Sequence, residues 1–158
     1  MLDLLAIFCA KYLIAFSLIL AAAAFLRLSR DKQRSMIIFA AITLPIIYLT
    51  AVIAGYFYNN PRPFVVLHFV PLIPHGNDNG FPSDHMLLAS TLASIWTIYN
   101  RRIGLVLGVL ALFIGIARVY AGVHHPVDII GSVIVAGSVT CALHLMMRKF
   151  NFVTKPKS

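Results

Sequence analysis

The chain has 158 residues, 60% of them hydrophobic and only 11% charged, and its mean hydropathy is +0.89. A soluble domain carries roughly 25% charged residues, so this composition excludes an ordinary soluble protein and indicates an integral membrane protein. The net charge of +8 would suit a nucleic-acid-binding protein. We expect no nucleic-acid partner, because the basic residues lie mostly between apolar runs, where they report membrane topology.

Five apolar runs predict an all-α bundle of about five transmembrane helices that forms a single domain over residues 1–158. In chain order the runs cover residues 4–26, 36–58, 83–99, 103–119 and 126–147. Pro45 predicts a kink in the second run. A loop rich in Pro, Gly, Asn and His follows over residues 59–82, and a polar tail covers residues 148–158. The third and fourth runs are each roughly 25 Å long as helices, so we expect their outer ends at or just below the lipid headgroups.

The charge distribution predicts the orientation of these helices. Ten of the thirteen lysine and arginine residues follow the first, third or fifth run: Arg27, Arg30, Lys32, Arg34, Arg101, Arg102, Arg148, Lys149, Lys155 and Lys157. With five spans these segments share one face, and the positive-inside rule assigns that face to the cytoplasm. We therefore expect the N-terminus, the loop over 59–82 and the turn over 117–128 outside, and the C-terminus in the cytoplasm.

Polar chemistry is concentrated in the turn over residues 117–128, which reads Ala-Arg-Val-Tyr-Ala-Gly-Val-His-His-Pro-Val-Asp. Gly122 allows the chain to reverse, and Pro126 suits the first position of the next helix. Asp128 follows His124 by four residues, close enough for its carboxylate to accept the Nδ1–H and leave Nε2 free as a nucleophile. A carboxylate at this position would also cap the helix N-terminus, and both roles stay open.

Two further segments bring polar residues to the same outer face. Arg62 lies between two prolines at the start of the loop, and Ser83, Asp84 and His85 begin the third helix. Together with Arg118 they supply guanidinium forks, a hydroxyl and free helix N–H groups, a set that suits a phosphate anion. Ser83 would also serve as a plain N-cap. Other polar residues of the loop are expected mainly to meet water, with substrate contact left open: His68, His75, Asn77, Asp78 and Asn79.

The order and spacing of these residues resemble the three-part signature of the phosphatidic acid phosphatase type 2 superfamily. The resemblance covers about residues 55–132 and rests on Arg62-Pro63, on Pro82-Ser83-Asp84-His85, and on Arg118, His124 and Asp128. Within the superfamily the chain is most similar to bacterial undecaprenyl-diphosphate phosphatases of the bacitracin-resistance type. It departs from the common signature at three positions, where Gly55 replaces a lysine, Asp84 a glycine and Ala117 a serine.

The resemblance implies a mechanism that needs no metal ion or other cofactor. His124 would attack the terminal phosphorus and form a phosphohistidine, while Asp128 orients the ring and stabilises its charge. His85 would protonate the leaving oxygen and then activate water. Three residues would bind the phosphate oxygens: Arg62, Arg118 and Ser83.

The resemblance also implies a substrate and a location. The protein would hydrolyse undecaprenyl diphosphate to undecaprenyl phosphate in the bacterial cytoplasmic membrane, with its active site facing the periplasm or cell exterior. It would thereby recycle the carrier lipid of peptidoglycan biosynthesis. Alternative substrates are phosphatidylglycerophosphate and lipid A phosphates, and phosphoryl transfer to another lipid is an alternative reaction. A protein that only binds or transports lipid phosphates is the alternative of a different class. The oligomeric state stays open.

Lys11 and Asp84 are additional candidates for the phosphate site. Lys11 lies in the outer third of the first run, where an ionised ammonium costs several kcal/mol unless it finds an anion or snorkels to the headgroups. Two interpretations stay open: Lys11 snorkels, or it replaces the lysine missing at position 55 and binds the substrate's phosphates. Asp84 would temper the positive field or hold an arginine in place.

Overall fold

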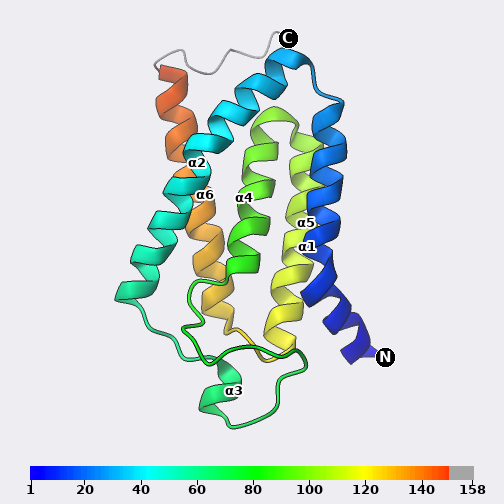
Figure 1. Cartoon of the computed structure of the whole chain (residues 1–158), viewed down its shortest axis with the longest axis vertical. Helices are drawn as coiled ribbons and strands as arrows, with labels where there is room; N and C mark the ends of the chain where they lie inside the picture. Colours follow the sequence, from blue (N-terminus) through cyan, green and yellow to red (C-terminus); the bar gives the residue numbers. More distant parts are fainter. Residues whose placement is uncertain (150–158) are drawn as a thin grey trace.

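In the computed structural model, which describes residues 1–149, the fold consists of six helices and contains no strand (Figure 1). The helices are α1 (Leu2–Leu26), α2 (Arg30–Phe57), α3 (Pro63–Val66), α4 (Asp84–Tyr99), α5 (Arg101–Tyr120) and α6 (Pro126–Lys149). The prediction of an all-α membrane bundle is confirmed, and each expected run lies within one of the longer helices or within a residue of its end.

Within residues 1–149, four helices are long and apolar enough to cross a membrane: α1, α2, α5 and α6. The fifth expected span, α4, has 16 residues and is therefore about 24 Å long, shorter than the roughly 30 Å hydrocarbon core. It packs against α5, α6, α1 and α2, and it stands in the middle of the bundle in Figure 1. The short helix is thus enclosed by the long ones, whose outer faces carry many exposed apolar side chains.

The link between α1 and α2 is shorter than expected. Only residues 27–29 separate the two helices, because the basic segment from Arg30 onward forms the first turns of α2. Gln33 closes this turn, since its Nε2 donates a hydrogen bond of 2.9 Å to Phe25 O. The α2 helix then continues through Pro45, which lies inside it.

Two other segments differ from the expectation. The loop after α2 contains the short helix α3, which starts at Pro63, a residue that favours the first helical position. Arg148 and Lys149, expected in the polar tail, belong to the last turn of α6. The rest of that tail, residues 150–158, lies outside the described residues.

An aromatic core holds together the end of the bundle that lies away from α3. Trp96 of α4, Phe39 of α2 and Leu107 of α5 are at most 1% exposed and belong to one apolar cluster. Gly104 lets α5 approach α4 closely, because a Cβ there would lie only 2.5 Å from the Thr97 backbone nitrogen. This packing fixes the direction in which α4 and α5 point toward the other end.

The polar candidates all lie at one end of the bundle. The N-terminus, the loop that carries α3, the start of α4 and the turn between α5 and α6 share this end, while the other two turns and the end of α6 lie opposite (Figure 1). The basic residues expected on the cytoplasmic face, as far as they are described, belong to the opposite end. The fold therefore separates the candidate site from the positively charged end.

Candidate active site

The turn between α5 and α6 buries a histidine. Gly122 adopts a φ of +77°, and a Cβ there would lie 2.5 Å from the Phe69 ring, so both backbone conformation and space require glycine. The α6 helix starts at Pro126. His124, between these two residues, is only 2% exposed although it belongs to a turn. Its ring therefore points into the protein.

The hydrogen bonds of His124 define its tautomer. Nδ1 lies 3.0 Å from Gly80 O and 3.4 Å from Asp128 Oδ2, and both atoms are acceptors, so Nδ1 carries the proton. Nε2 lies 3.3 Å from Nη1 of Arg62 and 3.3 Å from Nη2 of Arg118, and guanidinium nitrogens only donate. The lone pair of Nε2 thus points between two arginines. Burial, and then the charges of Arg118 and Arg62, lower the pKa of His124 despite the opposing hydrogen bond to Asp128.

Asp128 makes the contacts that both roles left open by the sequence require. Its side chain is buried, with Oδ2 facing His124 and accepting a 2.8 Å hydrogen bond from the backbone nitrogen of His125 at the start of α6. Oδ1 accepts a 2.7 Å hydrogen bond from Asn60 Nδ2. The acceptor closest to His124 Nδ1, however, is the carbonyl of Gly80. A Cβ on Gly80 would lie 3.1 Å from Asp128 Oδ2, so a glycine at this position lets the loop backbone lie close to the Asp128 carboxylate.

Both expected phosphate-binding arginines are buried, each at 3% exposure. Arg62 donates from Nε to Asp78 Oδ1 over 2.9 Å and from Nη1 to Val123 O over 2.9 Å. Arg118 donates from Nη1 to Ala10 O over 3.4 Å. Its Nε has no hydrogen-bond partner among the described residues. Two desolvated cations with donor capacity to spare form a strong anion site.

Ser83 adds a free hydroxyl to this site. It is the N-cap residue of α4 and is fully buried, yet its side chain makes no capping hydrogen bond. Within residues 1–149 its Oγ has no partner at all. A buried hydroxyl without a partner costs about 1–3 kcal/mol, so this atom and Arg118 Nε are polar groups to which a bound phosphate would give partners.

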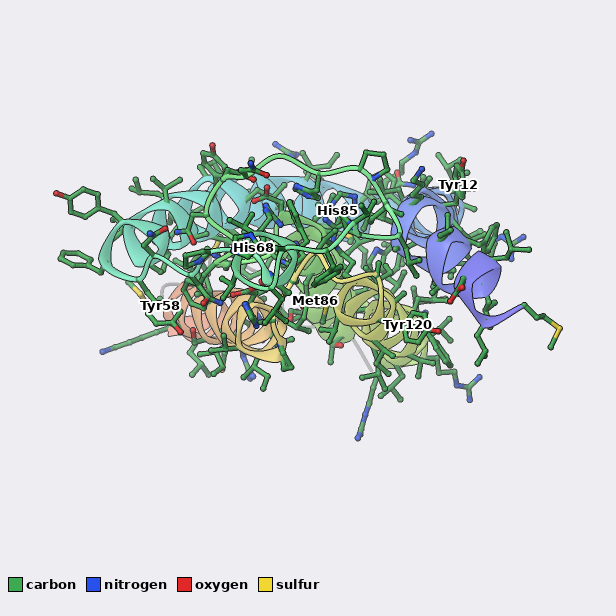
Figure 2. All side chains as sticks on the ribbon, turned by 90° about the horizontal axis from the view of Figure 1, so that it is seen from below. Tyr12, Tyr58, His68, His85, Met86 and Tyr120 are labelled. Atoms are coloured by element: carbon green, nitrogen blue, oxygen red, sulfur yellow. The ribbon has the colours of Figure 1, made fainter. Side chains whose placement is uncertain are left out.

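A cleft of about 230 Å³ opens beside Arg118. Its lining combines apolar residues with four groups that can bind or protonate an anion: Lys11, His75, His85 and Arg118. In the view onto this end of the bundle, His85 lies near the centre, between α2 and α1 (Figure 2). The structure thus brings the expected His85 and the uncertain Lys11 to the same cleft.

Position 55 has no room for the lysine of the common signature. A Cβ on Gly55 would lie 2.9 Å from Phe81 O, and the Gly55 carbonyl accepts a 2.9 Å hydrogen bond from Asn79 Nδ2. The loop that follows α2 therefore folds back against Gly55. A side chain here would displace backbone.

The expectation that Asp84 holds an arginine is wrong. Its side chain is exposed at the start of α4, and it makes no hydrogen bond or ion pair within residues 1–149. The carboxylate that pairs with Arg62 belongs instead to Asp78, whose side chain is 67% exposed, in line with the expectation that it mainly meets water. His75, for which substrate contact also stayed open, accepts a 3.1 Å hydrogen bond from Arg118 Nη2 at its Nε2.

Asn60 and Gly80 were also missed as site residues. Each adjoins a segment with expected site residues, Asn60 before Pro-Arg-Pro and Gly80 before Phe-Pro-Ser-Asp-His, and this adjacency was the only signal in the sequence. Among the described residues, no group of three or more His, Cys, Asp or Glu side chains is placed to hold a metal ion.

Comparisons with known proteins agree with the resemblance that the motifs indicate. The model of the PAP2 superfamily matches residues 34–152. Undecaprenyl-diphosphatase BcrC of Bacillus subtilis (strain 168) is 36% identical over 140 residues, which are 85% of this chain and 69% of that protein. The bacitracin transport permease protein BcrC of Bacillus licheniformis is 33% identical over 158 residues, covering 99% of this chain and 73% of that protein. The crystal structure of Aquifex aeolicus LpxE is similar with a TM-score of 0.67 and 25% identity, covering 91% of this chain and 86% of that one.

Proposed function

The chain belongs to the PAP2 superfamily, and we propose that it is a membrane hydrolase that converts undecaprenyl diphosphate to undecaprenyl phosphate through a phosphohistidine. The observation that carries the proposal is the unprotonated Nε2 of His124, which lies 3.3 Å from each of two buried guanidinium groups. Two guanidinium groups beside one nucleophilic nitrogen suit a phosphate group that is bound and then attacked at phosphorus. We propose undecaprenyl diphosphate as the substrate because the Bacillus subtilis relative is named an undecaprenyl-diphosphatase.

In the binding step, the terminal phosphate enters between Arg62 and Arg118. The guanidinium N–H groups that now donate to His124 Nε2 turn to the phosphate oxygens, which are stronger acceptors because they are charged. Arg118 Nε and Ser83 Oγ, which lack partners in the described structure, add two more hydrogen bonds. This exchange frees the lone pair of Nε2 at the moment when phosphorus arrives.

In the covalent step, Nε2 of His124 forms a bond to phosphorus as the bond from phosphorus to the bridging oxygen breaks. The negative charge of the bound diphosphate favours protonation of His85, which then gives its proton to that oxygen, and undecaprenyl phosphate leaves. The phosphohistidine keeps its Nδ1–H on Gly80 O and Asp128 Oδ2, and the Asp128 carboxylate stabilises the positive ring. His85 then takes a proton from water as the water oxygen forms a bond to phosphorus and the bond from phosphorus to Nε2 breaks, which releases inorganic phosphate and restores His124.

Lys11 and Asp84 complete the proposed site. Lys11 lines the same cleft as His85 and Arg118, so α1 delivers an ammonium to the phosphates from a different helix than the one that carries Gly55. A diphosphate bears more negative charge than a monophosphate and gains more from this third cation. The exposed Asp84, at the start of α4, tempers the positive field of the site and makes no direct contact with an arginine.

We further propose that the whole chain forms one lipid-phosphatase domain in the bacterial cytoplasmic membrane, with its active site facing the periplasm or cell exterior. The separation of the site from the basic end supports this orientation, because lysine and arginine in short loops stay on the cytoplasmic side. The enzyme would then act on carrier lipid exposed on the outer leaflet and return it to peptidoglycan biosynthesis.

A second candidate is a protein that binds or transports a lipid phosphate without cleaving it. It is favoured by the name of the Bacillus licheniformis relative, a bacitracin transport permease protein. This candidate needs the arginines but has no use for an unprotonated nucleophile held by Gly80 and Asp128. Within the enzymatic class, phosphatidylglycerophosphate, lipid A phosphates and transfer to another lipid are the alternatives.

A phosphate-release assay on the purified protein in detergent tests the proposal. The panel contains undecaprenyl diphosphate, phosphatidylglycerophosphate and a lipid A phosphate, and His124→Ala is the matched control. We expect the highest kcat/KM for undecaprenyl diphosphate and no release by the variant. Binding without release from any lipid would support the second candidate, and a preference for another lipid would reassign the substrate.

A further inference from the structure

Residues 73–79, in the loop between α3 and α4, contact both arginines of the site. At one end of this segment, Leu72 N donates a 3.0 Å hydrogen bond to Ala121 O in the turn, and the adjacent Ile73 is 3% exposed in a cluster with Ala121 and Val123. The segment is therefore anchored to the turn that carries the nucleophile.

The other end of the segment is anchored at Asn79. Its Oδ1 accepts hydrogen bonds from the backbone nitrogens of Asn60 and Phe81 over 2.9 and 3.0 Å, and its Nδ2 donates to Gly55 O. The backbone between these anchors is therefore held at both ends, although it has no regular secondary structure.

Two side chains of this segment meet the arginines. His75 Nε2 accepts a 3.1 Å hydrogen bond from Arg118 Nη2, and its ring lies edge-on to His124 with centroids 6.0 Å apart. Asp78 Oδ1 accepts a 2.9 Å hydrogen bond from Arg62 Nε. Nδ1 of His75 lies 3.8 Å from the same Asp78 oxygen. His75 and Asp78 are thus close neighbours in the loop, and each contacts a different arginine.

We propose that His75 and Asp78 form a bridge that positions the two phosphate-binding arginines on either side of His124. The inference rests on the proposed function of this site, which it extends by two positioning residues. It assigns them a role in phosphate binding, with no proton transferred and no bond made by either side chain.

The bridge offsets an electrostatic repulsion between the two arginines. Arg62 and Arg118 both donate to the one Nε2 atom of His124, so two guanidinium charges are held close together in a buried place, where they repel each other strongly. Each guanidinium also has an acceptor of its own, Asp78 Oδ1 at Arg62 Nε and His75 Nε2 at Arg118 Nη2, and these acceptors oppose the repulsion. A site whose hydrogen-bond donors are already in place spends less free energy on reorganisation when the negatively charged phosphate binds.

His75 must be neutral to accept a hydrogen bond from Arg118. Burial lowers the pKa of His75, and the positive charges of Arg62 and Arg118 lower it further against the opposing charge of Asp78. The hydrogen bond from Arg62 lowers the pKa of Asp78, so that this carboxylate stays ionised. His75 therefore serves as an uncharged acceptor and Asp78 as a charged one.

The test measures inhibition by inorganic phosphate, a product that needs only the arginine site. His75→Ala should raise the Ki of phosphate about tenfold, because misplaced binding groups lose much of their effect. His75→Gln places an amide oxygen close to the position of Nε2 and should stay within about twofold of the unsubstituted protein. His68→Asn is the matched control, since His68 is an exposed histidine of the same loop, and asparagine tolerates its φ of 53°.

A double-mutant cycle tests whether the two residues act as one bridge. Asp78→Ala should also raise the Ki about tenfold, and the combined variant should be less impaired than the product of the two single effects. A normal Ki in folded His75→Ala, an equal defect in His75→Gln, or independent effects in the cycle would each overturn the proposal. If the protein releases no phosphate from any lipid, the proposed function fails, and the same variants are compared by the rise in unfolding temperature that inorganic phosphate produces. That shift should shrink in His75→Ala and persist in His75→Gln, and equal shifts would overturn the bridge.

Discussion

Asn60 donates a 2.7 Å hydrogen bond from Nδ2 to Oδ1 of Asp128, which leaves Oδ2 directed at His124. Asn60→Ala should lower kcat by about ten- to a hundredfold, because a carboxylate free to turn no longer holds the nucleophile in its reactive orientation. Steady-state kinetics of folded protein measure this effect. Asn77→Ala, in an exposed part of the loop, is the control and should leave kcat unchanged. Equal kcat in both variants would remove Asn60 from the site.

The free hydroxyl of Ser83 predicts opposite effects on stability and activity. Ser83→Ala removes a buried group without a partner, so the free energy of unfolding should rise by about 1 kcal/mol. Its kcat/KM should fall about tenfold, because the phosphate loses one hydrogen bond. Ser90→Ala is the matched control, because Ser90 Oγ on α4 is also buried without a partner. This variant should gain stability and keep its activity. A loss of stability in Ser83→Ala would show that the hydroxyl has a structural partner.

Replacement of Lys11 should lower kcat/KM more for diphosphates than for monophosphates. Lys11→Met keeps the length and apolar character of the side chain and should lower kcat/KM for a prenyl diphosphate about tenfold, which is about 1.4 kcal/mol of transition-state stabilisation. The loss for a monophosphate should be smaller. Lys32→Met, an exposed lysine at the opposite end, should change neither value. If Lys11→Met behaves like Lys32→Met, Lys11 only snorkels to the headgroups.

The parts of the site that could be predicted from the sequence share a local origin. His124 and Asp128 are four residues apart on one turn, and the apolar runs on either side carry an unambiguous helical signal. The arginines and Ser83 follow from the resemblance to a known signature. In each case a short stretch of sequence holds both the structural and the chemical information.

The contacts of the long loop could not be predicted in the same way. Arg118 meets His75 across 43 positions of sequence, and Asn60 meets Asp128 across 68. Loop residues have no hydrophobic periodicity that reveals which face they present, and a polar side chain in a loop ordinarily meets water. For this reason the contacts of Asp78 with Arg62 and of His75 with Arg118 could not be predicted, and the arginine contact expected of Asp84 is wrong.

The proposed orientation predicts labelling from outside the cell. With Cys9 and Cys141 replaced by alanine, a cysteine introduced as Asn77→Cys should react with a membrane-impermeant thiol reagent in intact cells or spheroplasts. Lys32→Cys, at the opposite end of the bundle, should react only after the membrane is opened. The reverse pattern would place the site in the cytoplasm and contradict the topology inferred from charge.

The most direct test of the account is to trap the covalent intermediate. Brief incubation with undecaprenyl diphosphate labelled in its terminal phosphate, followed by quenching in base, should yield a phosphoryl-protein that survives alkali, is lost in acid and maps to His124. His124→Ala should give no adduct and no turnover, while His85→Ala, tested for turnover alone, should slow hydrolysis by about 10²- to 10⁴-fold. A labelled adduct on another residue, or near-normal turnover in folded His124→Ala, would contradict the mechanism.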